Sequence, residues 1–86
     1  MNKDLLEFPC EFSIKMMGRD RPQFRAAAIS LIEQHAGKIH DDAIRTAVSR
    51  NGNFLSVTIT IEAQHRQQLD DIYRDLGNHD DILIAL

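Results

Sequence analysis

The sequence predicts an α+β fold, a ferredoxin-like βαββαβ sandwich in which a four-stranded antiparallel sheet carries two helices on one face. Three observations support this prediction. Two segments alternate apolar and polar residues with the period of two that half-buried strands show. Two others repeat apolar residues every three or four positions, which is typical of amphipathic helices. Right-handed crossovers between segments in this order place both helices on the same face of the sheet.

The first strand and helix are predicted from the alternation and from their end signals. Every second residue of Phe8–Met16 is apolar, and Gly18 is expected to end this strand. Asp20 is expected to cap the following helix, and Pro22 suits its first turn, where a missing N–H costs nothing. The helix is expected to stop at Gly37. Its apolar stripe consists of Phe24, Ala27, Ala28, Leu31, Ile32 and His35.

The second half of the chain predicts a hairpin, a helix and a last strand. Residues Ala43–Arg50 form a weak strand, and Asn51–Asn53 supplies a turn that tolerates positive φ. A second helix is expected from about Gln64 to Leu76, with Gly77 as its stop. Asp81–Leu86 is apolar on both faces and is expected to be an interior or well-covered strand. The return strand of the hairpin points inward with Leu55, Val57, Ile59 and Ile61.

The sheet face turned away from the helices is predicted to be rich in hydroxyl groups. The alternation places Ser13, Lys15, Ser56, Thr58, Thr60 and the neighbours of Thr46 on it. We interpret this surface as largely uncharged. Two interpretations stay open, a face that binds a second copy or another protein and a face that is simply solvated.

Composition and charge limit the class of protein. The 86 residues are expected to form one domain, residues 1–86, with a single core and no deep catalytic cavity. A net charge of −3 without a basic half argues against nucleic-acid binding. No apolar run reaches the roughly 20 residues that a membrane-spanning helix needs. The lone Cys10 excludes an intramolecular disulfide and fits a reducing cytoplasm, which is the expected location.

The loop between the first strand and the first helix is the candidate ligand-binding site, formed by Gly18, Arg19, Asp20 and Arg21. We expect backbone N–H groups after Gly18 and at the helix start to point toward solvent. Two loop arginines, with Arg25 nearby, add positive charge, so the loop suits a carboxylate or a phosphate of a small anionic metabolite. The alternative is that Asp20 only caps the helix and the arginines are solvated.

Other reactive side chains lack the spacing that chemistry requires. No two of the four histidines have the helical i, i+4 spacing of a zinc site, so no metal is expected. The acidic pairs Asp41–Asp42, Asp70–Asp71 and Asp80–Asp81 are adjacent in sequence and cannot converge on one substrate atom. Cys10 alternates with Phe8 and Phe12 and is expected in the core. We therefore expect no catalytic residues, no cofactor and no enzymatic activity.

The whole chain resembles the YbeD-type family of small uncharacterised bacterial proteins. The resemblance rests on Leu5–Cys10, Lys15–Gly18, Asn51–Thr60 and Ile72–Leu76. It implies a ferredoxin-like fold similar to the ACT regulatory domain, with no established enzymatic activity.

The loop itself separately resembles an ACT domain through Gly18–Pro22, Ala27–Ile29 and Glu33–Ile39. In that family the corresponding turn borders the effector site, often between paired domains. Gln23 departs from the pattern, because ACT domains usually have a second glycine after the proline. A side chain at this position would crowd an amino-acid ligand.

Three functions follow as hypotheses. The first is an ACT-like regulatory module that acts through an unknown protein partner and self-associates as a homo-oligomer. The second is sensing of a small anionic metabolite at the loop. The third comes from a faint resemblance to acylphosphatase, in which Arg25 would bind phosphate and Asn51 would orient water. Pro22 opposes this hydrolase, because it removes a donor that a phosphate cradle needs.

Overall fold

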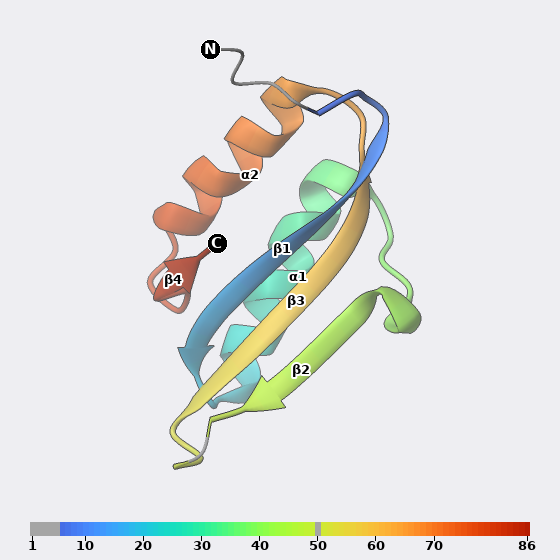
Figure 1. Cartoon of the computed structure of the whole chain (residues 1–86). Helices are drawn as coiled ribbons and strands as arrows, with labels where there is room; N and C mark the ends of the chain where they lie inside the picture. The colour runs from blue at the N-terminus through green and yellow to red at the C-terminus, as the bar shows by residue number, and fades with distance from the viewer. Residues whose placement is uncertain (1–5, 50) are drawn as a thin grey trace.

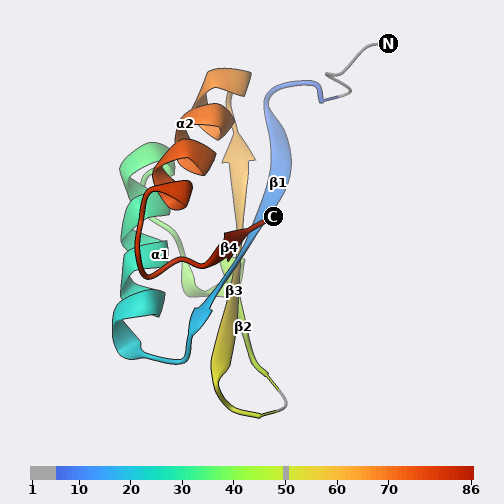
Figure 2. The same cartoon turned by 90° about the vertical axis from the view of Figure 1, so that its left-hand side faces the viewer.

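A computed structural model describes residues 6–49 and 51–86 and has the predicted ferredoxin-like α+β fold. The four strands form one antiparallel sheet in the order β2-β3-β1-β4, with β3 and β1 in the middle (Figure 1). Both helices cover the same face (Figure 2). The elements are β1 (Cys10–Arg19), α1 (Pro22–Ala36), the 3₁₀ turn η1 (Asp41–Ala43), β2 (Ile44–Val48), β3 (Phe54–Ala63), α2 (Arg66–Gly77) and β4 (Ile84–Ala85).

The core lies between the helices and the sheet. Alternation in β3 has the predicted phase, with Leu55, Val57, Ile59 and Ile61 buried. From the helices, Phe24, Ala28, Ile32, Leu69, Ile72 and Leu76 pack against them. No polar or charged side chain is buried among the described residues. The interior is therefore a packed apolar layer without internal chemistry.

Strand β1 does not stop at Gly18, so that prediction was wrong. The strand runs on to Arg19, and Gly18 is a buried position that pairs with Leu55 of β3. A Cβ on Gly18 would lie 2.5 Å from the Phe24 ring and 2.6 Å from the Asp81 carbonyl oxygen. This glycine therefore serves close packing and does not form a turn.

The start of α1 also differs from the prediction. Arg21, and not Asp20, is the N-cap, and its side chain makes no capping hydrogen bond. The cap shifts because β1 is longer than expected and Asp20 is still held by the sheet, donating its N–H to the Asn53 carbonyl. Pro22 occupies the first turn as predicted, and Gly37 ends the helix with a φ of 79°.

Helix α2 begins two residues later than expected, at Arg66. The His65 ring accepts a hydrogen bond from the N–H of Gln68 at 3.1 Å and caps the helix. Gly77 is the last helical residue and not a stop, because the chain continues in right-handed backbone at Asn78.

The last strand was expected to be interior or well covered, and this was wrong. β4 has two residues and pairs only with β1, at the edge of the sheet. Leu83, Ile84 and Leu86 are exposed, whereas Ile82 is buried in the core and Ala85 packs against it. The segment is apolar on both faces, yet the fold leaves most of it uncovered. Strand β2 is also shorter than predicted. Ala43, its predicted first residue, belongs to η1, and Arg50, its predicted last residue, lies outside the described residues.

Candidate functional site

The loop between β1 and α1 borders a small hollow of about 110 Å³. Arg19 and Arg21 line it, as the sequence predicted for a charged ligand, but Asp80 and Asp81 line it too. The remaining lining residues are Gln23, Phe24 and Leu83. Pockets for drug-sized ligands are typically about 300–1,000 Å³, so this hollow is large enough only for a small charged group.

The backbone of this loop offers fewer donors than expected. The N–H of Asp20 donates to the Asn53 carbonyl at 3.1 Å, and that of Arg21 donates to the Arg19 carbonyl at 2.7 Å. Pro22 has no N–H, and Phe24 donates its own to the Arg21 carbonyl. The expectation that these groups point to solvent was therefore wrong for Asp20, Arg21 and Phe24, whose N–H groups bond to backbone carbonyls.

The structure brings only some of the predicted loop residues to the hollow. Gly18 is buried beneath the ring of Phe24, and Asp20 does not line the hollow. The Arg19 guanidinium lies over the Phe54 ring with its carbon 5.7 Å from the ring centre, which anchors it to the paired strand β3. Arg25 and Asn51, the residues of the hydrolase hypothesis, do not line the hollow. The loop geometry gives that hypothesis no support.

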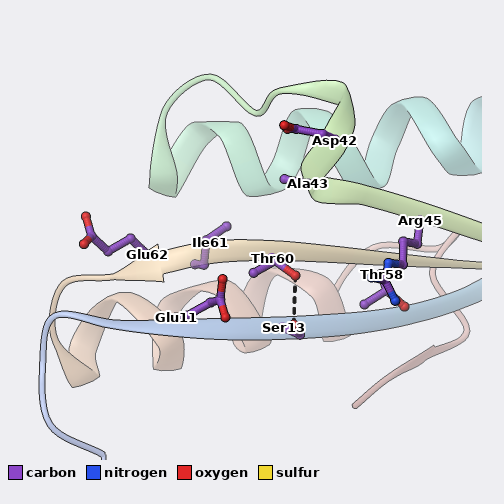
Figure 3. A pocket seen from close by; sticks show the side chains of 9 residues that line it. All are labelled: Glu11, Ser13, Asp42, Ala43, Arg45, Thr58, Thr60, Ile61 and Glu62. Atoms are coloured by element: carbon purple, nitrogen blue, oxygen red, sulfur yellow. Dashed lines mark hydrogen bonds between the residues drawn. The ribbon is translucent and has the colours of Figure 1, made fainter.

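A second candidate site lies on the sheet face opposite the helices. We call this surface the open face and define it by seven side chains of β1, β2 and β3: Glu11, Ser13, Lys15, Arg45, Thr58, Thr60 and Glu62. Six of them, all but Lys15, help to line a shallow groove of about 670 Å³ (Figure 3). Asp42, Ala43 and Ile61 complete the lining, so the groove extends from the open face to η1.

Strand register arranges the open face in three rows. The acidic row is Glu11 opposite Glu62, and the hydroxyl row is Ser13 opposite Thr60. The basic row is Lys15 and Arg45, one on each side of Thr58. The Ser13 and Thr60 hydroxyls lie 2.8 Å apart and share a hydrogen bond (Figure 3).

The open face is charged, so its interpretation as a largely uncharged threonine surface was wrong. Strand register places the Glu11 and Glu62 carboxylates opposite each other on this face. Asp42 lines the same groove from η1 and adds a third carboxylate at this side. Like charges directly opposite each other weaken a sheet. The Glu62 carboxylate accepts a hydrogen bond from the Gln64 amide at 3.2 Å, which is a neutral donor, so the acidic row still favours a cation.

Other ionisable groups lie on the helix layer. His35 and Asp75 hydrogen-bond at 2.7 Å between the end of α1 and α2. A hydrogen bond from Gln67 lowers the pKa of Asp71, and burial raises the pKa of Tyr73. None of these groups except Asp75 lines a hollow, and Asp75 lines one between the helices.

Two further features are absent from the part of the chain that the structure describes. No group of three or more histidine, cysteine, aspartate or glutamate side chains is placed there to hold a metal ion. No helix in residues 6–49 and 51–86 has both the length and the apolar character to cross a membrane.

Comparison with known proteins identifies relatives over the whole chain. A family model described as "Protein of unknown function (DUF493)" matches residues 3–86. A UPF0250 protein of Paraburkholderia phytofirmans is 37% identical over 86 residues, which cover 100% of this chain and 97% of the relative. A UPF0250 protein of Nitrosomonas europaea is 37% identical over 84 residues, covering 98% of this chain and 97% of the relative. These matches confirm the resemblance to the YbeD-type family.

The fold also matches a solved structure. The solution structure of protein HP0495 from H. pylori superposes with a TM-score of 0.65 at 16% sequence identity. The match covers 100% of this chain and 94% of the other. At this identity the likeness concerns the fold, which is ACT-like in both proteins.

Proposed function

Because the chain belongs to the DUF493 family, whose description states no function, we propose that it is a non-catalytic regulatory module that acts through protein contacts at its open face. Its UPF0250 relatives have names that state no catalytic activity. A chain with the single cysteine Cys10 suits a reducing environment, and this supports a cytoplasmic location.

The observation that carries this proposal is the charge arrangement of the open face. Its side chains come from the two central strands and β2, and all ten residues of β1 pair with β3. Groups on paired strands are held more rigidly than groups on loops, so the surface is preformed. It presents carboxylates, hydroxyls and cations in separate rows, which is a pattern that a protein surface can complement.

The open face suits a protein better than a nucleic acid or a small molecule. Glu11, Glu62 and Asp42 would repel phosphates at one side of the groove. The groove is shallow, and it is bordered by exposed polar side chains instead of the apolar walls that bury small ligands.

Site-specific photo-crosslinking in the native host tests this proposal. A photoreactive amino acid at Thr58 reports contacts of the open face, and the same residue at Gln67 is the control, because Gln67 is exposed on α2. We expect crosslinked protein adducts from position 58 and none of the same mass from position 67. Adducts from position 67 alone would refute the assignment to the open face.

A second candidate function is recognition of a small charged metabolite at the β1–α1 hollow. Arg19 and Arg21 support binding of a carboxylate or phosphate there. Asp80 and Asp81 line the same hollow and favour a ligand that also carries a positive group. We therefore propose a ligand with both charges over a purely anionic one.

Thermal denaturation with candidate ligands tests this second function. A ligand at 100 times its dissociation constant adds about 2.7 kcal/mol, which raises the midpoint of a domain of this size by roughly 10 °C or more. The double variant R19A/R21A should lose the shift. The matched control R25A/K38A should keep it, because both of its residues are exposed outside the hollow. A flat screen with zwitterionic and anionic ligands would refute this candidate.

A further inference from the structure

We propose that the open face binds the open face of a second copy of this chain, in a face-to-face dimer with antiparallel strands. The proposal rests on the proposed function, which assigns protein contacts to this surface, and it names the partner. The two-fold axis lies between the two sheets, parallel to the hydroxyl row of Ser13 and Thr60.

The order of the rows makes the open face complementary to itself. The acidic row lies two residues to one side of the hydroxyl row, and the basic row lies two residues to the other side. A half-turn about the proposed axis exchanges these two sides. It places Glu11 of one copy over Lys15 of the second copy. Glu62 then lies over Thr58, one strand spacing of about 4.8 Å from Arg45.

The direction of the axis follows from the same charges. A two-fold axis parallel to the strands would keep each row in place and would put carboxylates over carboxylates. The acidic and basic rows are four residues apart, or about 13 Å along a strand. At this distance the acidic row and the basic row act as two separate charged bands. Of the two axes, only the one along the hydroxyl row places the acidic band of one copy over the basic band of the other.

The acidic band is unfavourable in an isolated chain, because Glu11 and Glu62 are directly opposed. The basic band costs little, since Lys15 and Arg45 are two strands apart, at about 10 Å, where salt screens exposed charges. A partner with one positive patch would relieve the acidic band alone. A second copy turned about the proposed axis relieves the acidic band and places opposite charges on the basic band in both chains, which is the reason for preferring it to an unrelated protein.

The middle of the surface lets two sheets approach. Ser13, Thr58 and Thr60 are short side chains, and packed sheets lie about 10 Å apart. Across that gap the long side chains of Glu11 and Lys15 can meet, while the hydroxyl groups occupy the centre.

The size of the surface predicts a weak dimer. The four strands β1 to β4 contain 10, 5, 10 and 2 residues. At about 3.3 Å along a strand and 4.8 Å across it for each residue, each copy offers roughly 430 Å². The two copies together bury about 850 Å², below the size of standard specific interfaces. Association should therefore depend on concentration and fall steeply as salt screens the charges.

Analytical ultracentrifugation of the whole chain tests the proposal. We expect reversible dimerisation at about 50 mM salt that weakens at about 500 mM salt, where screening is stronger. The reversals E11K/E62K and K15E/R45E should each weaken dimerisation by at least about tenfold, because both bands then carry the same sign. An equimolar mixture of the two variants should restore it, since every facing pair is again opposite in charge.

The control and the unfavourable outcomes separate this proposal from the proposed function. R25E/R74E changes net charge as K15E/R45E does, but at exposed positions of α1 and α2 on the helix layer, and should leave dimerisation unchanged. Circular dichroism checks that each variant folds. The salt dependence is measured on the unaltered chain and needs no variant. A monomer at every concentration, with Thr58 crosslinked to a different protein, would overturn the dimer and leave the proposed function intact. Dimerisation abolished by R25E/R74E and unaffected by both reversals would overturn the face-to-face dimer, and crosslinked adducts from position 67 alone would overturn the proposed function as well.

Discussion

Gly18 lies against the ring of Phe24 so closely that a Cβ on the glycine would be 2.5 Å from Cδ1 of the phenylalanine. The Asp81 carbonyl oxygen would be 2.6 Å from the same Cβ. This one contact joins β1, the first turn of α1 and the segment before β4. The glycine therefore sets the spacing between the helix layer and the sheet, on which the β1–α1 hollow depends.

Replacement of Gly18 by alanine should destabilise the fold by about 1–3 kcal/mol, because an added methyl group in a packed site forces backbone and ring to move. Urea unfolding measures this change. Gly77→Ala is the matched control, since nothing lies within 4 Å of a Cβ there and alanine favours a helix. Equal midpoints for the two variants would contradict the packing role of Gly18.

Tyr73 should titrate above its ordinary pKa of 10.0, because burial opposes the phenolate. Its hydroxyl also donates a hydrogen bond to the Leu86 carbonyl at 2.9 Å, which the phenolate cannot do. The raised pKa contributes stability that is fully present below pH 10 and is lost as the pH rises through the folded value. It is the only tyrosine and the chain has no tryptophan, so ultraviolet absorbance follows this group alone. Identical titration midpoints in folded and urea-unfolded protein would refute the shift.

The hydrogen bond between His35 and Asp75 should couple the two helices. It is 2.7 Å long, and Gln68 reinforces the junction by donating to the His35 carbonyl at 3.0 Å. A double-mutant cycle with alanine at both positions should give a coupling energy of about 0.5–1 kcal/mol, as for partly exposed pairs. The Arg66–Asp70 pair, longer at 3.4 Å and more exposed, should couple less strongly. A coupling near zero for His35 and Asp75 would mean that apolar packing and the Gln68 hydrogen bond join the helices without a contribution from this pair.

Sequence patterns predicted the fold well because the central elements have unambiguous periodicity. Strand β3 alternates without interruption and α2 carries a clear apolar stripe, so their type and orientation followed directly. The exceptions lie at the edges. In β2, Thr46 and Val48 point to the helix side as predicted but remain exposed, because alternation assigns a face without showing how far the helices cover it.

The candidate sites were less predictable, because they depend on contacts between distant segments. Asp80 and Asp81 lie some 60 residues from Arg21 in sequence, and only the fold brings them to the same hollow. Likewise, nothing in the local sequence pairs Glu11 with Glu62, since a shift of register would separate them. Gly18 was taken as a stop because the residues that crowd it, Phe24 and Asp81, become visible only in three dimensions.

Amide spectra of the ¹⁵N-labelled chain over a dilution series in low salt would locate the contact surface of the dimer without altering the protein. We expect concentration-dependent shifts for Ser13, Thr58, Thr60 and their neighbours in β1 and β3, which fade when salt is added. The exposed residues of α1 and α2 should not shift. Spectra unchanged by dilution, or shifts confined to the helices, would contradict the claim that the open face binds a second copy.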